Sequence, residues 1–250
     1  MVKEAFPNAI VKKVTIKFND NEYKAIICIC NFNNNSHYDH ARKLFHKEEL
    51  EYYSSLKYEK RQKSYVMGRY CAKRAISEYL EDENVESITI GKGVFNQPII
   101  FGPQNQNLQI SISHSGDFGG AIAYHERFVM GLDIEIIDED NRETLENEIT
   151  IEEKEILASL PYDYNRGLTL FWTAKEALSK ALKTGLMTPF SIFEISKIQV
   201  EEDYAICDFK FFAQYKIRSF KMGQYMCSIA YPKNIEFNVD SKDLSKLFNI

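Results

Sequence analysis

Two periodicities divide the chain into predicted strands and helices. Nine stretches rich in Ile, Val, Phe and Tyr, many alternating between apolar and polar positions, predict β-strands. These stretches are Ile10–Phe18, Tyr23–Phe32, Ser87–Ile90, Leu108–Ser113, Gly119–Tyr124, Phe128–Ile137, Phe193–Val200, Tyr204–Ala213 and Gln224–Ala230. Apolar residues spaced three and four apart predict helices. The helices are expected over Tyr38–Lys57, Tyr58–Leu80, Ile151–Leu160 and Leu168–Lys183.

The order of these elements favours the α+β class. Strands and helices mix without strict βαβ alternation, so antiparallel sheets packed on helices are expected. In the second predicted helix, Met67, Cys71, Ala75 and Tyr79 form a row at a spacing of four, and a neighbouring row starts at Gly68. The two rows make one apolar face, which predicts the side of this helix that packs on a sheet.

Two short segments of the first half recur in the second. Ala72–Ser77 resembles Ala174–Ser179, 102 residues later, and Ile122–Tyr124 recurs as Ile229–Tyr231, 107 residues later. The shared order and nearly equal spacing suggest a duplicated unit, although residues as common as Ala, Lys and Ile also match by chance.

A duplication would divide the chain into two similar halves, residues 1–125 and 126–250. Each half is expected to be a small antiparallel sheet on a long helix, with a ligand cleft between the halves. Because the two halves already pair within one chain, we also expect a monomer.

Composition and charge limit the classes of function. The 250 residues are 44% hydrophobic, enough for a sizeable core, and the net charge of −5 argues against general nucleic-acid binding. No uncharged apolar run reaches membrane-spanning length, and the N-terminal segment lacks the apolar region of a secretion signal. Five cysteines without metal-type spacing favour free thiols in a reducing compartment. We expect a cytoplasmic protein that binds neither nucleic acid nor membrane.

Three carboxylates suggest a cation site. Asp133 and Glu135 stand two apart in a predicted strand, so they share a face roughly 7 Å apart and repel unless a proton or cation lies between them. Glu176 and Lys180 lie one turn apart on a predicted helix, opposite its expected buried stripe. In one interpretation, Glu176 binds a hard ion such as Mg²⁺ and Lys180 binds phosphate. In the other, the two residues form an exposed ion pair that contributes about a few tenths of a kcal/mol to stability.

Two other segments offer donors to phosphate. A Ser-His-Ser-Gly turn begins at Ser113, and its hydroxyls, its backbone and the His114 imidazole suit phosphate oxygens, although a plain solvated turn is the alternative. The sequence offers no nucleophile partner at a spacing that would indicate a Ser-His-Asp triad.

The second segment is a basic run on the helix expected over Tyr58–Leu80. Lys60 and Lys63 share one helical face, and Arg69 and Lys73 share another. A solvated face and a site for a phosphate-rich ligand are both consistent with this pattern.

Four motifs in order resemble the Sfp-type 4′-phosphopantetheinyl transferases, which activate carrier proteins. The resemblance runs from about Lys57 to Gly185. Its motifs are Tyr65–Lys73 with a Gly-Arg pair, Ile112–Ser115 (Ile-Ser-His-Ser), Gly131–Glu135 (Gly-Leu-Asp-Ile-Glu) and Phe171–Lys180 (Phe-Trp-Thr-Ala-Lys-Glu-Ala-Leu-Ser-Lys), followed by Gly185-Leu186.

The resemblance implies an enzyme that transfers 4′-phosphopantetheine from coenzyme A to a serine of an acyl or peptidyl carrier protein, releasing adenosine 3′,5′-bisphosphate. It also implies a pseudo-dimer of two α+β halves. Asp133, Glu135 and Glu176 would hold Mg²⁺, with Mn²⁺ as a substitute, on the pyrophosphate, and Lys180 would contact that pyrophosphate.

The same resemblance implies the nucleotide contacts. Ser113 and His114 would grip the phosphates of coenzyme A, and Lys60 and Lys63 would stand near its 3′-phosphate. Gln97 occupies the place of the lysine in a Gly-Lys-Pro segment of many relatives, which changes the expected contact on the nucleotide side.

Glu153 has two interpretations. It matches a family glutamate proposed as the base that deprotonates the incoming serine. Thr150 and Glu153 also fit a capping box at the start of the third predicted helix. One carboxylate is not expected to do both at once.

Two other functions fit the same residues. A Mg²⁺-dependent nucleotide phosphodiesterase or pyrophosphatase would turn over coenzyme A without an acceptor protein. A non-catalytic module would bind coenzyme A or a carrier protein, but the complete set of Asp133, Glu135, Glu176 and Lys180 argues against it.

Overall fold

The computed structural model describes residues 6–102 and 107–245. The chain divides into two compact units, Met1–Arg127 (unit 1) and Phe128–Ile250 (unit 2), each with its own hydrophobic core. The first five residues, part of the segment on which the secretion prediction rests, lie outside the described residues. Within the described ranges, no helix is both long and apolar enough to cross a membrane.

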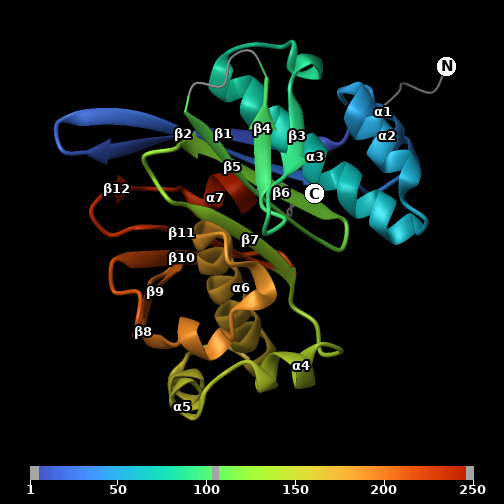
Figure 1. The fold of residues 1–250 in the computed structure, drawn as a ribbon. Helices are drawn as coiled ribbons and strands as arrows, with labels where there is room; N and C mark the ends of the chain where they lie inside the picture. Colours follow the sequence, from blue (N-terminus) through green and yellow to red (C-terminus); the bar gives the residue numbers. More distant parts are fainter. Residues whose placement is uncertain (1–5, 103–106, 246–250) are drawn as a thin grey trace. The chain divides into compact units, whose positions relative to one another are not determined.

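Unit 1 packs the long helix α3 on an antiparallel sheet whose strands β1, β2, β6 and β5 are neighbours in that order (Figure 1). Its strands are β1 Asn8–Phe18, β2 Asn21–Asn31, β3 Thr89–Lys92, β4 Pro98–Phe101, β5 Leu108–Ser115 and β6 Phe118–His125. Its helices are α1 Asn35–Arg42, α2 Lys47–Ser55, α3 Glu59–Leu80 and the 3₁₀ turn η1 Val85–Ser87. The β3–β4 pair forms a separate hairpin.

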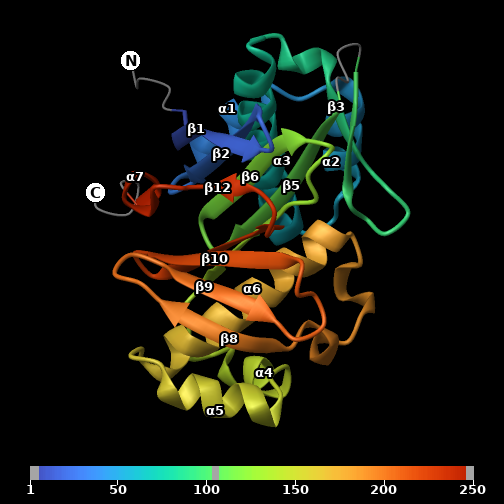
Figure 2. The same cartoon turned by 90° about the vertical axis from the view of Figure 1, so that its left-hand side faces the viewer.

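Unit 2 packs the long helix α6 on an antiparallel sheet in the order β7-β11-β10-β9-β8. Figure 2 shows β10, β9 and β8 in front of α6. Its strands are β7 Gly131–Ile136, β8 Ile195–Val200, β9 Ala205–Phe209, β10 Tyr215–Met222, β11 Tyr225–Pro232 and β12 Glu236–Phe237. Its helices are α4 Arg142–Asn147, α5 Ile151–Ser159, α6 Tyr164–Leu182, η2 Gly185–Met187, η3 Phe190–Phe193 and α7 Ser241–Ser245. The antiparallel sheets and packed helices confirm the α+β class.

The two units repeat one element order. From β2 in unit 1 and from β7 in unit 2, the chain runs through two short helices, a long helix and four antiparallel strands. The registers also correspond. Cys28 of β2 pairs with Ala121 of β6, and Asp133 of β7 pairs with Ser228 of β11, so the two partners are 107 residues apart. This offset equals that of the repeated Ile-Ala-Tyr segment, and the duplication seen in the sequence therefore extends to the fold.

Each unit contains the same buried ion pair between a short helix and the long helix. Glu49 of α2 accepts from Lys73 of α3 at 2.8 Å, and Glu153 of α5 accepts from Lys175 of α6 at 2.7 Å. Both glutamates close a capping box, and each also accepts from the backbone N–H of the strand that follows the long helix. These buried carboxylates tie three elements together in each unit.

Three sequence predictions about the elements need correction. The single helix expected over Tyr38–Lys57 is two helices, because His46 is the N-cap of a capping box that starts α2. The strands β4 and β10 were not predicted. On α3, the interpretation of the basic run as a solvated face is wrong for Lys73 and Arg69, which are buried against Glu49.

Candidate active site

A close approach of β7 to α6 creates the carboxylate cluster of unit 2. Gly131, Asp133 and Glu135 share one face of β7. A Cβ at Gly131 would lie 2.1 Å from the backbone oxygen of Ala177, so only glycine allows this packing. The strand therefore lies directly on the helix, and the side chain two residues later reaches Lys180 of α6.

Asp133 and Lys180 form the central ion pair of this cluster. The Lys180 Nζ donates to Asp133 Oδ1 at 2.6 Å. Asp133 is buried, whereas the lysine side chain retains 27% of its surface exposed. Burial by itself would lower the pKa of Lys180, but the charges of Asp133, Glu176 and Glu135 raise it above its ordinary value. The lysine is therefore a fixed ammonium among carboxylates.

Glu176 completes the cluster. Burial and the neighbouring charges of Asp133 and Glu135 raise its pKa to about 7, although Lys180 acts in the opposite direction. Burial is the larger cause, and the neighbouring carboxylates add to it. The structure thus brings together four residues that lie in two separate sequence motifs.

The donor set suits a hard divalent cation. Asp133 and Glu135 act on the pKa of Glu176 in one direction, and Lys180 acts in the other. Mg²⁺ and Mn²⁺ prefer carboxylate oxygens. Asp133, Glu135 and Glu176 are therefore a chemically matched set of ligands.

The placement of Glu176 and Lys180 differs from the sequence interpretation. Leu and Phe residues were expected to form the buried side of α6, and Glu176 and Lys180 were expected on the opposite, exposed side. In the structure, the small residues Ala174, Ala177 and Ala181 are also buried, so a second face of α6 is covered. Because the strand can come close over small side chains, the charged pair faces β7 rather than solvent.

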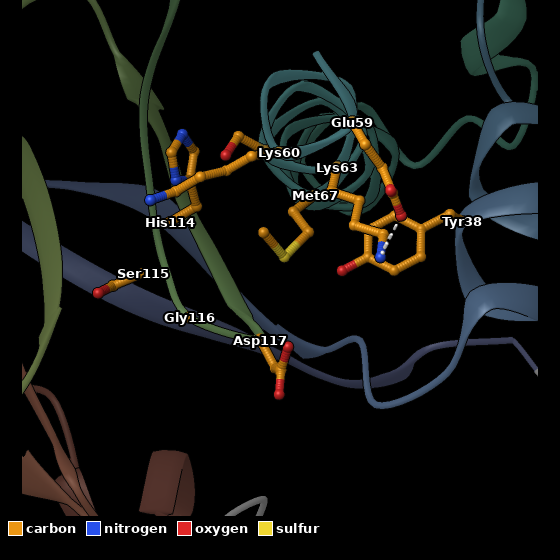
Figure 3. A pocket seen from close by; sticks show the side chains of 10 residues that line it. Tyr38, Glu59, Lys60, Lys63, Met67, His114, Ser115, Gly116 and Asp117 are labelled. Carbon is orange, nitrogen blue, oxygen red and sulfur yellow. Dashed lines mark ion pairs between the residues drawn. The ribbon is translucent and has the colours of Figure 1, made fainter.

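A cavity of about 600 Å³ in unit 1 contains three of the predicted phosphate-binding residues (Figure 3). Lys60 and Lys63 of α3 and His114 of β5 line it. Lys63 pairs with Glu59 at 2.8 Å and lies over the ring of Tyr38 at 5.6 Å from its centre. Two lysines, an imidazole and a turn backbone are suitable donors for a phosphorylated ligand.

Two predicted residues do not line this cavity. Ser113 is buried on β5, with 5% of its surface exposed. Gln97 lies in the β3–β4 turn, where its side chain accepts from the Phe95 N–H at 2.9 Å and its carbonyl accepts from the Gly93 N–H at 2.8 Å. Its side chain therefore stabilises a hairpin turn.

The cavity also contains residues that the sequence analysis did not select. They are Tyr38, Glu59, Ser64, Met67, Ser115, Gly116 and Asp117. Ser115 and Gly116 belong to the same Ser-His-Ser-Gly turn, so the motif contained them. Asp117 is the next residue of that turn, whereas Tyr38 belongs to α1, and only the fold brings it to α3.

Glu153 lies in the core of unit 2, where it caps α5 and pairs with Lys175. It has no exposed surface, and it accepts from Thr150 N, Lys175 Nζ and Ile195 N at 2.7–2.8 Å. Glu49 has the same set of partners in unit 1, as described above. These donors satisfy both carboxylate oxygens of Glu153. The capping-box interpretation of Glu153 is confirmed.

Comparison with known proteins gives three findings. No curated protein matches the chain. Among solved structures, a holo-(acyl-carrier-protein) synthase from Bacillus anthracis strain Ames, in complex with coenzyme A (3′,5′-ADP), is similar at 21% identity and a TM-score of 0.36. That similarity covers 45% of this chain and 96% of the synthase. Residues 129–230, which include the whole carboxylate cluster of unit 2, match the family model of the 4′-phosphopantetheinyl transferase superfamily.

Proposed function

We propose that this protein is an Sfp-type transferase that moves 4′-phosphopantetheine from coenzyme A to a serine of an acyl or peptidyl carrier protein. The observation that carries the proposal is the cluster of Asp133, Glu135, Glu176 and Lys180 inside the segment that matches the superfamily. The Gly-Arg helix and the Ser-His turn of unit 1 agree with the same family pattern.

The cluster is suited to charge development in the proposed reaction. Asp133, Glu135 and Glu176 would hold Mg²⁺, which would neutralise the pyrophosphate of coenzyme A. Attack by the serine oxygen on phosphorus would form one P–O bond, break the bond to adenosine 3′,5′-bisphosphate and release the serine hydroxyl proton to water. Negative charge grows on the non-bridging and departing oxygens, and the ammonium of Lys180 is fixed beside the carboxylates to stabilise it.

The cavity of unit 1 supports a role in binding the nucleotide. Lys60 and Lys63 would attract the 3′-phosphate, and His114 would donate to a phosphate oxygen. The raised pKa of Lys63, due to its hydrogen bond with Glu59, keeps this side chain charged at neutral pH. A phosphate that enters would compete with Glu59 for it.

A panel of carrier proteins tests the proposal. Each carrier is incubated with fluorescent coenzyme A and Mg²⁺, and the label is mapped by peptide mass. We expect serine labelling of at least one carrier, little labelling by Asp133→Ala, and normal labelling by Asp140→Ala, an exposed carboxylate just after β7. No labelling of any carrier, or equal labelling by Asp133→Ala, would contradict the proposal.

The same assay separates the alternative functions. Cleavage of coenzyme A without any carrier would identify a nucleotide phosphodiesterase or pyrophosphatase. Carrier binding without turnover, unchanged in Glu176→Ala, would identify a non-catalytic module.

A further inference from the structure

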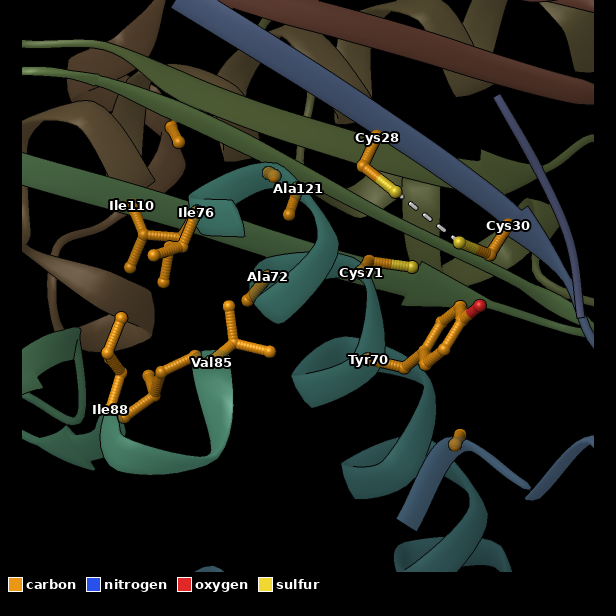
Figure 4. Packing of buried hydrophobic residues seen from close by; sticks show 14 of the residues in the cluster. Cys28, Cys30, Tyr70, Cys71, Ala72, Ile76, Val85, Ile88, Ile110 and Ala121 are labelled. Atoms are coloured by element: carbon orange, nitrogen blue, oxygen red, sulfur yellow. Dashed lines mark hydrogen bonds between the residues drawn. The ribbon is translucent and has the colours of Figure 1, made fainter. Parts of the chain in front are cut away.

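Three thiols meet in the core of unit 1. Cys28 and Cys30 share one face of β2, and Cys71 faces them from α3 (Figure 4). The Sγ atoms of Cys28 and Cys30 are 3.4 Å apart, and all three sulfurs lie within 4.8 Å of one another. None of these side chains is exposed. The sequence predicted free thiols, and their spacing could not indicate a cluster because Cys71 comes from a different element.

The cluster has the position in unit 1 that the carboxylates have in unit 2. Cys28 corresponds to Asp133, as their cross-strand partners show. Cys30 pairs with Gly119 of β6, and Glu135 pairs with Met226 of β11, again 107 residues apart. The two cysteines of unit 1 therefore occupy the positions that Asp133 and Glu135 occupy in unit 2. Both units direct two potential ligands from the same strand toward the long helix.

The packing around the sulfurs leaves room for them. A Cβ at Gly119 would lie 2.8 Å from Cys71 Sγ, so the glycine makes space for this thiol. Tyr70 lies beside the cluster (Figure 4).

The duplicated position on the long helix differs between the two units. Arg74 occupies the place that Glu176 has in unit 2, 102 residues later.

The spacing of the sulfurs fits metal coordination. A metal–sulfur bond of about 2.3 Å places the sulfurs of a trigonal or tetrahedral centre roughly 3.8–4.0 Å apart. The three sulfurs here fall within 4.8 Å of one another before any ligand is bound. Thiolates select soft ions, above all Cu(I) and Zn(II).

We propose that Cys28, Cys30 and Cys71 bind one soft d¹⁰ metal ion, Cu(I) or Zn(II), as a structural site of unit 1. Each thiol that coordinates releases its proton, so binding strengthens as pH rises. Because the cluster has no exposed surface, the ion enters while the chain folds. The site is independent of the carboxylate cluster and of the proposed transferase activity.

Refolding the full chain with metal tests the proposal. The protein is unfolded with a chelator and a reductant, refolded with Zn(II) or with Cu(I), and desalted before its metal content is measured. We expect one ion per chain for wild type with at least one of the two metals, together with a higher Tm. We expect almost none for the double variant Cys28→Ala/Cys71→Ala. Cys207→Ala, which removes a buried thiol of unit 2, should bind as wild type does.

A measurement on the wild type keeps the test decisive if the double variant does not fold. The refolded protein is alkylated in partial denaturant, and the modified cysteines are mapped by mass. Metal should slow the alkylation of Cys28, Cys30 and Cys71 at least tenfold and leave Cys207 unchanged. Equal metal content in wild type and variant, no binding of either ion, or a disulfide within the cluster would overturn the proposal.

Discussion

At the scale of single residues, the balance of charge around Lys180 decides the chemistry of unit 2. Its Nζ is 2.6 Å from Asp133, and the carboxylates nearby keep its pKa raised, so it stays an ammonium over the physiological range. A fixed positive charge contributes most where charge develops during the reaction.

Removing that ammonium should lower turnover more than binding. We expect Lys180→Ala to reduce kcat by about 100- to 1,000-fold, with a much smaller change in the KM for coenzyme A. Lys180→Arg should retain more activity than the alanine variant. Steady-state carrier labelling measures both constants. An equal loss in Lys180→Ala and in Lys183→Ala, just past the end of α6, would contradict a specific role.

The raised pKa of Glu176 predicts how the stability of the metal-free protein changes with pH. Its pKa in the folded state is about 7, raised from 4.5, so the folded state binds more protons than the unfolded state between these values. Stability contributed by this group is therefore complete below about pH 4.5 and is lost as pH rises through 7. At pH 8, Glu176→Gln should be more stable than wild type by about 1–3 kcal/mol, and at pH 4 the two should be similar.

Thermal unfolding in the presence of a chelator measures this difference. Asp140→Asn serves as the control, because it changes an exposed carboxylate outside the cluster. A difference between wild type and Glu176→Gln that does not vary from pH 4 to pH 8 would refute the assignment.

At the scale of elements, the buried Glu–Lys pairs fix each short helix to its long helix. In unit 2 the pair also lies next to the site, since Lys175 directly precedes Glu176 on α6. A buried pair that loses one partner leaves an uncompensated charge, which costs about 3–5 kcal/mol.

We therefore expect Lys175→Met to destabilise the protein by roughly that amount, and Lys175→Met combined with Glu153→Gln to recover part of the loss. Lys73→Met is the matched variant in unit 1. It should destabilise the protein by a similar amount while leaving the carboxylate cluster of unit 2 in place. Chemical denaturation gives the free energies of unfolding. Full activity and stability in Lys175→Met would show that the pair does not position α6.

The contact of β7 with α6 gives a second prediction for the elements. Gly131→Ala places a Cβ 2.1 Å from the Ala177 oxygen, so the strand must move away from the helix. We expect lower stability, by about 1–3 kcal/mol, and a large loss of activity as Asp133 moves away from Lys180. Gly102→Ala is the control, because its nearest contact is 3.3 Å from a side chain of Ile88. Normal labelling by Gly131→Ala would contradict this account.

At the scale of the whole molecule, the carboxylate cluster and the cationic cavity belong to different units of the duplicated fold. Their roles should therefore separate in kinetics. Lys60→Ala combined with Lys63→Ala should raise the KM for coenzyme A by roughly 10-fold or more and change kcat little, because uniform binding energy is lost. Lys47→Ala, an exposed lysine of α2, should leave both constants unchanged. A fall in kcat alone would place the two lysines in the chemical step.

The sequence by itself determined the local periodicities and the order of the motifs. Alternating strands, the apolar face of α3, the capping box at Thr150 and the duplicated segments all depend on neighbours along the chain. They could be predicted because backbone geometry sets a period of 2 or 3.6 residues. The pairing of Asp133 and Glu135 on one face follows from the same rule.

Only the tertiary structure decided which side chains face one another. It turned Glu176 and Lys180 toward β7, because small alanines on α6 and Gly131 allow a close approach. It buried Glu153 and Glu49 against lysines far away in the chain, and it gathered three separate thiols into one cluster. These outcomes depend on packing between distant segments, which no local period encodes.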